Sequence, residues 1–365
     1  MKQVHPEEIR RVLIRATNWV GDAVMSIPAM REIRRRFPEA RISLLVRPWV
    51  KDVYGAIDFV DEILIYDKAG AHRGWAGLRK LAAGLRSRRF DIAILLPNAM
   101  EAALIAFWAR IPIRLGYARD GRAPLLTHAV RINPEVLKVH QAYYYLGILA
   151  GAGLMPARPW AQPEYQLDAI GIRVGDADRK AARALLESRG VKSWYPVVGL
   201  NPGAAYGGAK RWPADRFAAV ADILVSQWRA QIVVVGSAGE KGIAGEVVRA
   251  ARSPLVSLAG ETTLGQLMGL MLECDLFITN DSGPMHLAAA LDVPQLAIFG
   301  STSEVATGPL SRCARVLKHP VACNPCFLRE CPTDFQCMLG LGIKEVAAAA
   351  GDLLAKSADT KKVPG

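Results

Sequence analysis

The chain alternates short apolar runs with longer segments of helical spacing. Four runs of strand type lie at residues 12–16, 42–46, 63–66 and 92–96, and five more lie at 197–200, 232–235, 256–258, 276–279 and 296–299. Segments of helical pattern separate them, among them 216–228 and 263–272. Repeated βαβ order is typical of parallel sheets. The pattern therefore predicts an α/β fold with two doubly wound, Rossmann-like lobes.

A proline-rich stretch at 151–168 interrupts the alternation and predicts a linker. We expect an N-terminal lobe over 1–165, a linker and connecting helix over 166–190, and a C-terminal lobe over 191–345. The remainder, 346–365, is expected to be a helix end and flexible tail. Because 365 residues are more than a domain with one hydrophobic core usually contains, the length fits two domains. Ligands of such sheets bind at the carboxyl ends of the strands, so we expect the lobes to face each other across a cleft that holds the active site.

The segment Thr279-Asn280-Asp281-Ser282-Gly283-Pro284-Met285-His286 joins an apolar strand to an alanine-rich helix. Gly283 permits a sharp turn and Pro284 suits a first helical turn. A helix that starts there directs unpaired N–H groups into the loop, where a phosphate binds well. The alternative is that Asp281 or Ser282 only caps the helix and that His286 is an ordinary buried histidine.

Two further junctions carry polar groups after strands. In the first lobe, Asn18, Gly21 and Asp22 follow the run at 12–16, although an acid in a first helical turn also complements the helix dipole without further function. In the second lobe, residues 200–213 read Leu-Asn-Pro-Gly-Ala-Ala-Tyr-Gly-Gly-Ala-Lys-Arg-Trp-Pro. Its small residues leave room for a diphosphate and Lys210 adds positive charge. The segment lacks the Walker spacing, and no dinucleotide-binding G-x-G-x-x-G motif follows the first strand of the chain.

Composition and charge limit the class of protein. Hydrophobic residues make up 51% and charged residues 22%, no apolar run approaches the length of a membrane span, and the first residues lack a secretory signal, so we expect a cytoplasmic protein. Residues 1–160 hold 25 Lys and Arg against 14 Asp and Glu, whereas the rest of the chain is nearly balanced. The first lobe should present a basic face to nucleic acid, an anionic membrane or an acidic glycolipid, unless that charge only aids solubility.

The motifs together resemble glycosyltransferase family 9, the lipopolysaccharide heptosyltransferases. The resemblance is carried by 18–22 (Asn-Trp-Val-Gly-Asp), by 201–203 (Asn-Pro-Gly) with 210–213 (Lys-Arg-Trp-Pro), and by 280–286. It covers almost the whole chain. Arg47-Pro48-Trp49 and the cysteine-bearing segment 323–338 look closest to the heptosyltransferase II group, although siblings that add the first or third heptose share most motifs.

The resemblance implies a GT-B fold in which the C-terminal lobe binds ADP-L-glycero-D-manno-heptose and the basic lobe binds the lipid A inner core. It implies an inverting transfer with Asp22 as general base. Lys210 and the helix start at Ser282 and Gly283 would stabilise the departing ADP. Asp281 would orient the donor, and His286 would reach the diphosphate or support Asp281.

Other site residues follow from the same resemblance. On the donor side it implies Asn201, Gly203 and Glu240, where Glu240 would contact the ribose or instead cap a helix; on the acceptor side it implies Asn18, Arg47 and Arg119. It requires no cofactor and no catalytic metal. We expect a monomer that contacts the cytoplasmic leaflet of the inner membrane by its surface and binds no nucleic acid, since no recognised nucleic-acid fold accompanies the basic face.

Six cysteines need a separate account. Cys274 and Cys313 are isolated and are expected to be small buried or inert residues. The other four, with spacing C-x2-C-x4-C-x5-C, would hold a structural zinc or iron–sulfur group or would be free thiols in a loop: Cys323, Cys326, Cys331 and Cys337.

Two other classes of function stay open. A nucleotide-sugar epimerase of the same architecture would need catalytic acids for donor isomerisation but no basic acceptor lobe. A non-catalytic protein that binds anionic glycolipid would keep the basic face but would not need Asp22 opposite the donor loop.

Overall fold

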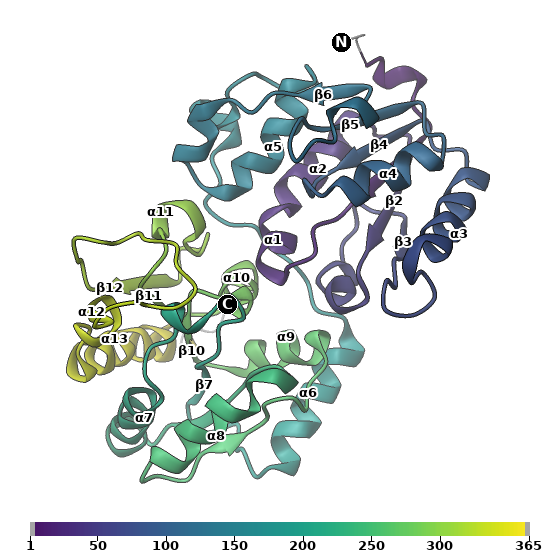
Figure 1. The fold of residues 1–365 in the computed structure, drawn as a ribbon. Coiled ribbons are helices and arrows are strands. Elements are labelled where there is room, and N and C mark those ends of the chain that lie inside the picture. Colours follow the sequence, from purple (N-terminus) through teal and green to yellow (C-terminus); the bar gives the residue numbers. More distant parts are fainter. Residues whose placement is uncertain (1–3, 362–365) are drawn as a thin grey trace. The chain divides into compact units, whose positions relative to one another are not determined.

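The computed structural model describes residues 4–361 and divides into two compact units, Met1–Leu167 and Asp168–Gly365 (Figure 1). Each unit contains one six-stranded parallel sheet covered by helices on both faces. In the part of the chain that is described, no helix is both long and apolar enough to cross a membrane.

The sheet of the first unit has the strand order β3-β2-β1-β4-β5-β6. The chain winds outward from β1 in one direction and, after returning to β4, in the other, so the order reverses between β1 and β4. In doubly wound sheets this reversal is where ligands bind. The strands are β1 (Arg11–Arg15), β2 (Arg41–Val46), β3 (Glu62–Ile65), β4 (Ile92–Leu95), β5 (Ile113–Tyr117) and β6 (His128–Val130).

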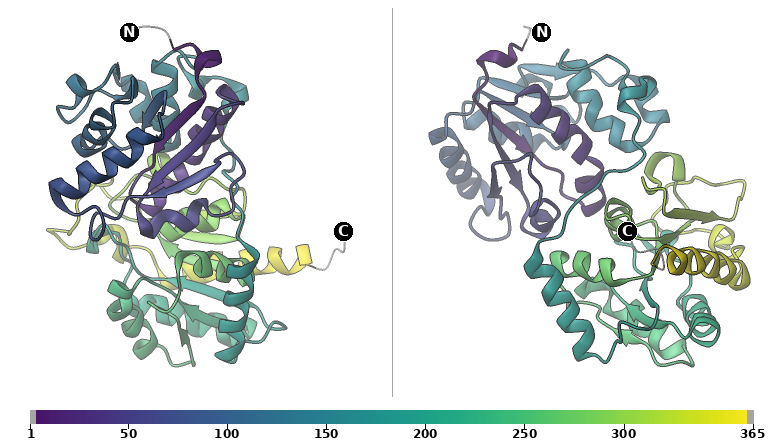
Figure 2. Two further views of the ribbon diagram at one scale, coloured as in Figure 1. Left: turned by 90° about the vertical axis from the view of Figure 1, so that its right-hand side faces the viewer. Right: turned by 180° about the vertical axis from the view of Figure 1, so that it is seen from behind.

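Helices cover both faces of this sheet (Figure 2). On one face α3 and α4 pack together and bury Leu13, Leu45 and Ala93 from the strands. Successive strand residues point to opposite faces, so Val12 and Ile14 face the other layer, where α1, α2 and α5 contact one another. The helices are α1 (Val20–Met25), α2 (Ile27–Arg36), α3 (Gly74–Ser87), α4 (Met100–Trp108) and α5 (Gln141–Gly151).

The second unit repeats this arrangement. Its strand order is β12-β11-β10-β7-β8-β9, with the reversal between β7 and β10. The strands are β7 (Val197–Asn201), β8 (Gln231–Val234), β9 (Val256–Ser257), β10 (Leu276–Asn280), β11 (Gln295–Phe299) and β12 (Ala314–Lys318). The helices are α6 (Asp176–Ser188), α7 (Ala214–Trp228), α8 (Lys241–Ala250), α9 (Leu264–Glu273), α10 (Gly283–Ala290), α11 (Glu304–Thr307), α12 (Gln336–Leu339) and α13 (Ile343–Lys361).

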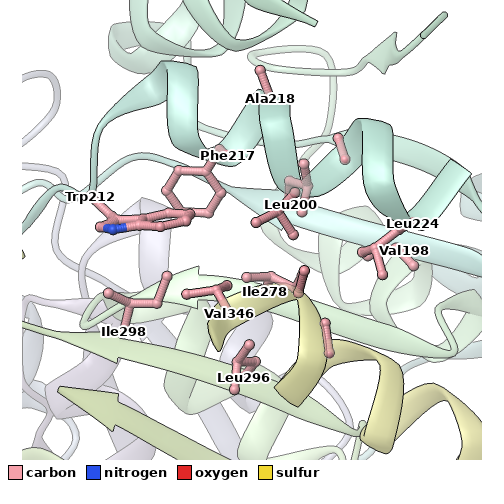
Figure 3. Close-up of a cluster of buried hydrophobic side chains, with 14 of the residues drawn as sticks. Val198, Leu200, Trp212, Phe217, Ala218, Leu224, Ile278, Leu296, Ile298 and Val346 are labelled. Atoms are coloured by element: carbon pink, nitrogen blue, oxygen red, sulfur yellow. The ribbon is translucent and has the colours of Figure 1, made fainter. Parts of the chain in front are cut away.

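One extensive core lies on one face of the second sheet (Figure 3). Leu200, Ile278 and Ile298 project from neighbouring strands toward Phe217 of α7 and Val346 of α13. Alternate residues of each strand face this core, and their packing fixes where each strand ends. The residues that directly follow the strands are therefore placed at defined positions along the carboxyl edge of the sheet. This edge carries the donor-type motifs.

All nine strands predicted from apolar runs are present, whereas β5, β6 and β12 were not predicted. The proline-rich stretch at 151–168 contains two short 3-10 turns. The helix α6, which the sequence analysis grouped with the linker at 166–190, packs against α9 of the second unit. The expected tail continues α13 to Lys361, and residues 362–365 lie outside the described residues. The 3-10 turns are η1 (Pro6–Glu8), η2 (Pro48–Tyr54), η3 (Ala123–Leu125), η4 (Pro134–Lys138), η5 (Pro159–Ala161), η6 (Pro163–Tyr165), η7 (Gly208–Lys210) and η8 (Ala238–Glu240).

Candidate active site

Asn280, the last residue of β10, fixes the predicted diphosphate loop of the second unit. Its side-chain carbonyl accepts from the backbone N–H of Trp212 at 3.0 Å, and its amide donates to the carbonyl of Pro202 at 2.9 Å. Trp212 is fully buried, so the loop is anchored at both ends. One buried amide therefore connects the carboxyl ends of β10 and β7.

Asp281 forms an ion pair with Lys210 across the same edge. Lys210 Nζ donates to Asp281 Oδ2 at 2.6 Å, and the hydroxyl of Thr302 donates to the same oxygen at 2.5 Å. The Asp281 side chain is 4% exposed and that of Lys210 14% exposed, so the pair is shielded from water. Tyr206 lies beneath the ammonium, with 5.0 Å from Nζ to the ring centroid. The carboxylate positions the cation and does not cap α10.

The side chain of the N-cap residue does not cap the start of α10. Ser282 is its N-cap residue but makes no side-chain capping bond, so the alternative that Asp281 or Ser282 merely caps this helix is wrong. Instead the Asn201 amide donates to Ser282 Oγ at 2.9 Å and to Thr279 Oγ1 at 3.0 Å. The first N–H groups of a helix have no partner within it and attract negative charge. His286 lies one turn further along and is buried.

Glu240 caps a helix, as one of the two sequence interpretations proposed. Its Oε2 accepts from the N–H and the hydroxyl of Ser237 at 2.8 and 2.7 Å, which completes a capping box at η8. The same side chain lies over Gly203, where an added Cβ would be 2.2 Å from Glu240 Oε1. Glu240 thus stands at the carboxyl end of β7, beside the diphosphate loop.

The loop that carries four cysteines supports the diphosphate loop from the other side. The N–H of Ala209 donates to the carbonyl of Arg329 at 2.9 Å, and the N–H of Gly208 donates to Glu330 at 3.0 Å. The Tyr206 hydroxyl donates to the carbonyl of Phe327 at 2.8 Å. The two loops therefore form one hydrogen-bonded layer.

These four cysteines line one cavity of about 240 Å³. Burial, together with the three neighbouring thiols, raises the pKa of the Cys337 thiol. All are free thiols, and within residues 4–361 no cluster of His, Cys, Asp or Glu has the arrangement of a metal site. Of the two isolated cysteines, Cys274 is buried as expected, but Cys313 is exposed.

In the first unit, Asp22 lies in the first turn of α1, next to the end of β1. Its Oδ1 accepts a hydrogen bond of 2.8 Å from the hydroxyl of Tyr145 on α5. Burial, followed by the charge of Asp22, raises the pKa of the Tyr145 phenol well above its usual value, so the phenol stays protonated and keeps donating. Tyr145 therefore fixes one carboxylate oxygen.

Asn18, also after β1, is held by its neighbours. Its side-chain oxygen accepts from Arg15 at 2.7 Å, and its backbone carbonyl accepts from the Trp49 indole at 2.8 Å.

The predicted acceptor arginines are in contrasting environments. Arg47 is buried, with its guanidinium 4.1 Å from the Tyr66 ring centroid and 3.6 Å from the Glu101 carboxylate. Burial opposes ionisation of Glu101, but the hydrogen bond from Lys68 and the charges of Lys68 and Arg47 lower its pKa overall. The Arg119 side chain, in contrast, is exposed. Arg47 therefore organises this edge of the unit, while Arg119 is open to a ligand.

The structure gathers most predicted residues within their own units: Asn201, Gly203, Lys210, Glu240, Asp281, Ser282 and Gly283 in the second, and Asn18, Asp22 and Arg47 in the first. Sequence reasoning missed Thr302, Tyr206 and Tyr145. Thr302 follows β11, the strand beside β10, so its position after a predicted strand was a usable signal. Tyr145 is 123 residues from Asp22, and no local pattern indicates that contact.

Comparisons with known proteins give a consistent result. The sequence profile of glycosyltransferase family 9 (heptosyltransferase) matches residues 78–336. Lipopolysaccharide heptosyltransferase 2 of Salmonella typhimurium is 33% identical over 317 residues, which are 84% of this chain and 88% of that protein. The corresponding protein of Escherichia coli is 32% identical over the same shares of the two chains.

Two solved structures extend the likeness to the fold. The ADP-heptose lipopolysaccharide heptosyltransferase II of E. coli has a TM-score of 0.79 and 27% identity, covering 95% of this chain and 99% of its own. The family 9 glycosyltransferase of Veillonella parvula has a TM-score of 0.82 and 25% identity, covering 95% and 98%. This likeness confirms the predicted fold, α/β of GT-B type with two doubly wound units.

Proposed function

We propose that this chain, which belongs to glycosyltransferase family 9, transfers heptose from ADP-heptose to the inner core of lipopolysaccharide, adding the second heptose to the first. The observation that carries the proposal is the likeness to proteins named heptosyltransferase 2 over most of both chains. The geometry of each unit supports it, because one unit carries a site suited to a diphosphate and the other an oriented carboxylate.

The second unit supplies the donor half of the reaction. Lys210 has three ammonium donors, of which Asp281 takes one, so the others can bind phosphate oxygens. The start of α10 at Ser282 and Gly283 adds N–H groups and the positive end of a helix dipole. Negative charge accumulates on ADP as the glycosidic bond breaks. Groups fixed in place before the reaction stabilise that charge. Thr302 holds Asp281, and Asp281 together with the Tyr206 ring keeps Lys210 in place.

The first unit supplies the acceptor half. Asp22 takes the proton from the acceptor hydroxyl as its oxygen attacks the anomeric carbon, which inverts the configuration. Tyr145 holds one carboxylate oxygen, and this contact orients the carboxylate. Arg119 is exposed and suits the phosphates and carboxylates of the inner core, while Asn18 and Arg47 shape the surrounding surface.

The enzyme acts as a monomer at the cytoplasmic face of the inner membrane, which it contacts by its surface. The donor is ADP-L-glycero-D-manno-heptose, no cofactor is required, and nucleic acid is not a partner. The excess of basic residues in the first 160 positions supports contact with an anionic leaflet.

The decisive experiment measures ADP release with acceptors that carry zero, one or two heptoses. Turnover with the one-heptose acceptor alone is expected; preference for zero or two heptoses would indicate a sibling enzyme that adds the first or third. Turnover without any acceptor would indicate an epimerase or hydrolase, and binding without turnover a glycolipid-binding protein.

A second measurement tests the base. Asp22→Asn is expected to lower the rate of transfer by about 10²–10⁴-fold while ADP-heptose still binds. The control is Asp58→Asn, which changes an exposed acid elsewhere in the first unit. Full activity of Asp22→Asn would refute the assignment.

A further inference from the structure

An open groove of about 670 Å³ lies on the outer surface of the first unit, where α3 and α4 pack side by side. We call it the arginine groove. Its polar lining is four arginines, and its apolar lining includes two aromatic rings: Arg79, Arg86, Arg110 and Arg114, with Phe107 and Trp108. None of these residues takes part in the proposed transfer site. Figures 1 and 2 show α3 along the periphery of its unit.

The two segments that carry the groove contain no acidic residue. Residues 73–90 and 102–119 together contain nine Lys and Arg and no Asp or Glu. Within the described part of the chain, no ion pair involves Arg79, Arg86 or Arg110. The side chains of Arg79, Arg86 and Arg110 are exposed and have no acidic partner there, so together they form a surface that attracts an external anion.

Aromatic side chains surround these cations. Trp75 is 68% exposed and Phe107 45% exposed, which is unusual for such large apolar groups. The Trp75 and Trp108 rings are 5.9 Å apart, and Arg79 lies over Trp108 at 5.7 Å. Exposed tryptophan beside arginine is the combination that places side chains at the boundary between lipid headgroups and acyl chains.

Folding of the unit does not account for this surface. The inner face of α3 is complete, since Leu78, Leu81 and Leu85 are buried against the sheet. Arg114 is held by hydrogen bonds to the carbonyls of Leu125 and Ile111, at 2.6 and 2.5 Å, so one cation of the groove has a fixed position. Arg79, Arg86, Arg110 and Phe107 are exposed, whereas Trp108 is partly buried against the core.

We propose that the arginine groove docks the enzyme on a bilayer that contains anionic phospholipid. The arginines bind lipid phosphates, and Trp75 with Phe107 enters the headgroup region. The inference rests on the proposed contact with the membrane and specifies the surface that makes it. Nucleic acid also binds arginine, but no row of exposed aromatics at base spacing accompanies the groove, and tryptophan at its rim favours lipid.

The test is sedimentation of the full chain with vesicles of phosphatidylglycerol and phosphatidylethanolamine, and with vesicles of phosphatidylcholine. Wild type should bind the anionic vesicles, and high salt should release it. The double variant Arg79→Gln/Arg86→Gln should weaken binding about thirtyfold, since each cation near an anionic surface contributes about 1 kcal/mol. Trp75→Ala should also weaken it.

Matched controls carry the same chemical changes elsewhere. Arg131→Gln/Arg249→Gln removes two exposed arginines outside the groove, and Trp194→Ala removes a tryptophan that is 71% exposed in the second unit. Both should bind vesicles like wild type. If they lose as much binding as the groove variants, or if the groove variants bind normally, the proposal is wrong.

A water-soluble acceptor oligosaccharide separates docking from catalysis. With it, the groove variants should release ADP at the wild-type rate, whereas with acceptor embedded in anionic vesicles they should be slower. Loss of activity with both acceptors would place the groove in the transfer site and refute docking. Stronger wild-type binding to duplex DNA than to vesicles, lost in the same variants, would identify nucleic acid as the occupant instead.

Discussion

A side chain at position 203 is expected to displace the side chain of Glu240. A Cβ at position 203 would lie 2.2 Å from Glu240 Oε1 and 2.4 Å from its Cδ, well inside van der Waals contact. In Gly203→Ala the glutamate side chain must therefore swing away. That movement breaks its two bonds to Ser237 and dissolves the capping box before α8.

The magnitude follows from the cap. Loss of a side-chain cap costs about 1 kcal/mol of unfolding free energy. Glu240→Ala loses the same cap, so it should cost the same. In the double variant the methyl group added at position 203 meets no glutamate side chain. The double variant should therefore also lose about 1 kcal/mol of unfolding free energy. The two substitutions should therefore be non-additive by about 1 kcal/mol, as residues in direct contact are.

Urea unfolding of the two single variants and the double variant measures this coupling. Gly239→Ala is the control in the same turn, because its added Cβ would meet only Ser237 Oγ, at 3.9 Å. Additive costs would refute the reasoning. Calorimetric titration with ADP adds a second readout: equal loss of affinity in all three variants supports contact of Glu240 with the ribose, and unchanged affinity limits Glu240 to capping.

Three further predictions concern the ion pair, a buried phenol and metal dependence. Lys210→Met should raise the Kd for ADP-heptose at least about tenfold, because a charge-assisted hydrogen bond contributes about 1.5–3 kcal/mol; titration checks this, and Lys210→Arg should lose less. Burial raises the pKa of the Tyr117 phenol, so the stabilisation by this residue is present below about pH 10 and is lost as pH rises further. Above about pH 10, the difference in unfolding free energy between wild type and Tyr117→Phe should shrink by about 1.4 kcal/mol per pH unit. Urea unfolding at about pH 9 and about pH 11 measures this change. Chelation with EDTA should leave ADP release unchanged, and a loss reversed by added metal would contradict the proposed roles of Lys210 and α10.

The strands that the sequence predicted are those with continuous apolar runs, because parallel strands buried on both faces need them. The missed strands lack such runs. β5 contains Arg114 and Gly116, β6 has three residues, and β12 lies at the sheet edge with Arg315 and Lys318 in it. Their hydrogen bonds to neighbouring strands, and not their composition, place them in the sheets.

Motif residues near strand ends could be predicted for a similar reason. The ends of adjacent parallel strands meet at one edge, so Asn201 and Asp281 belong together once their strands are known. The partners that position these groups are harder to foresee. Tyr145 and Thr302 act from other elements, and only tertiary packing decides that Asp281 holds Lys210 and does not cap α10.

The contact between the diphosphate loop and the cysteine-bearing loop depends strongly on main-chain atoms. Ala209 donates its N–H to a carbonyl, and Tyr206 reaches another carbonyl, whatever side chains residues 329 and 327 carry. Substitutions of Phe327 and Arg329 can therefore keep these two hydrogen bonds, provided that the backbone path is kept, whereas the bond from Gly208 depends on the side chain of Glu330. Insertions and deletions in the cysteine-bearing loop would shift these carbonyl groups and break the contact. Among natural or engineered variants, we expect the length of this loop to stay constant while the side chains at 327 and 329 vary.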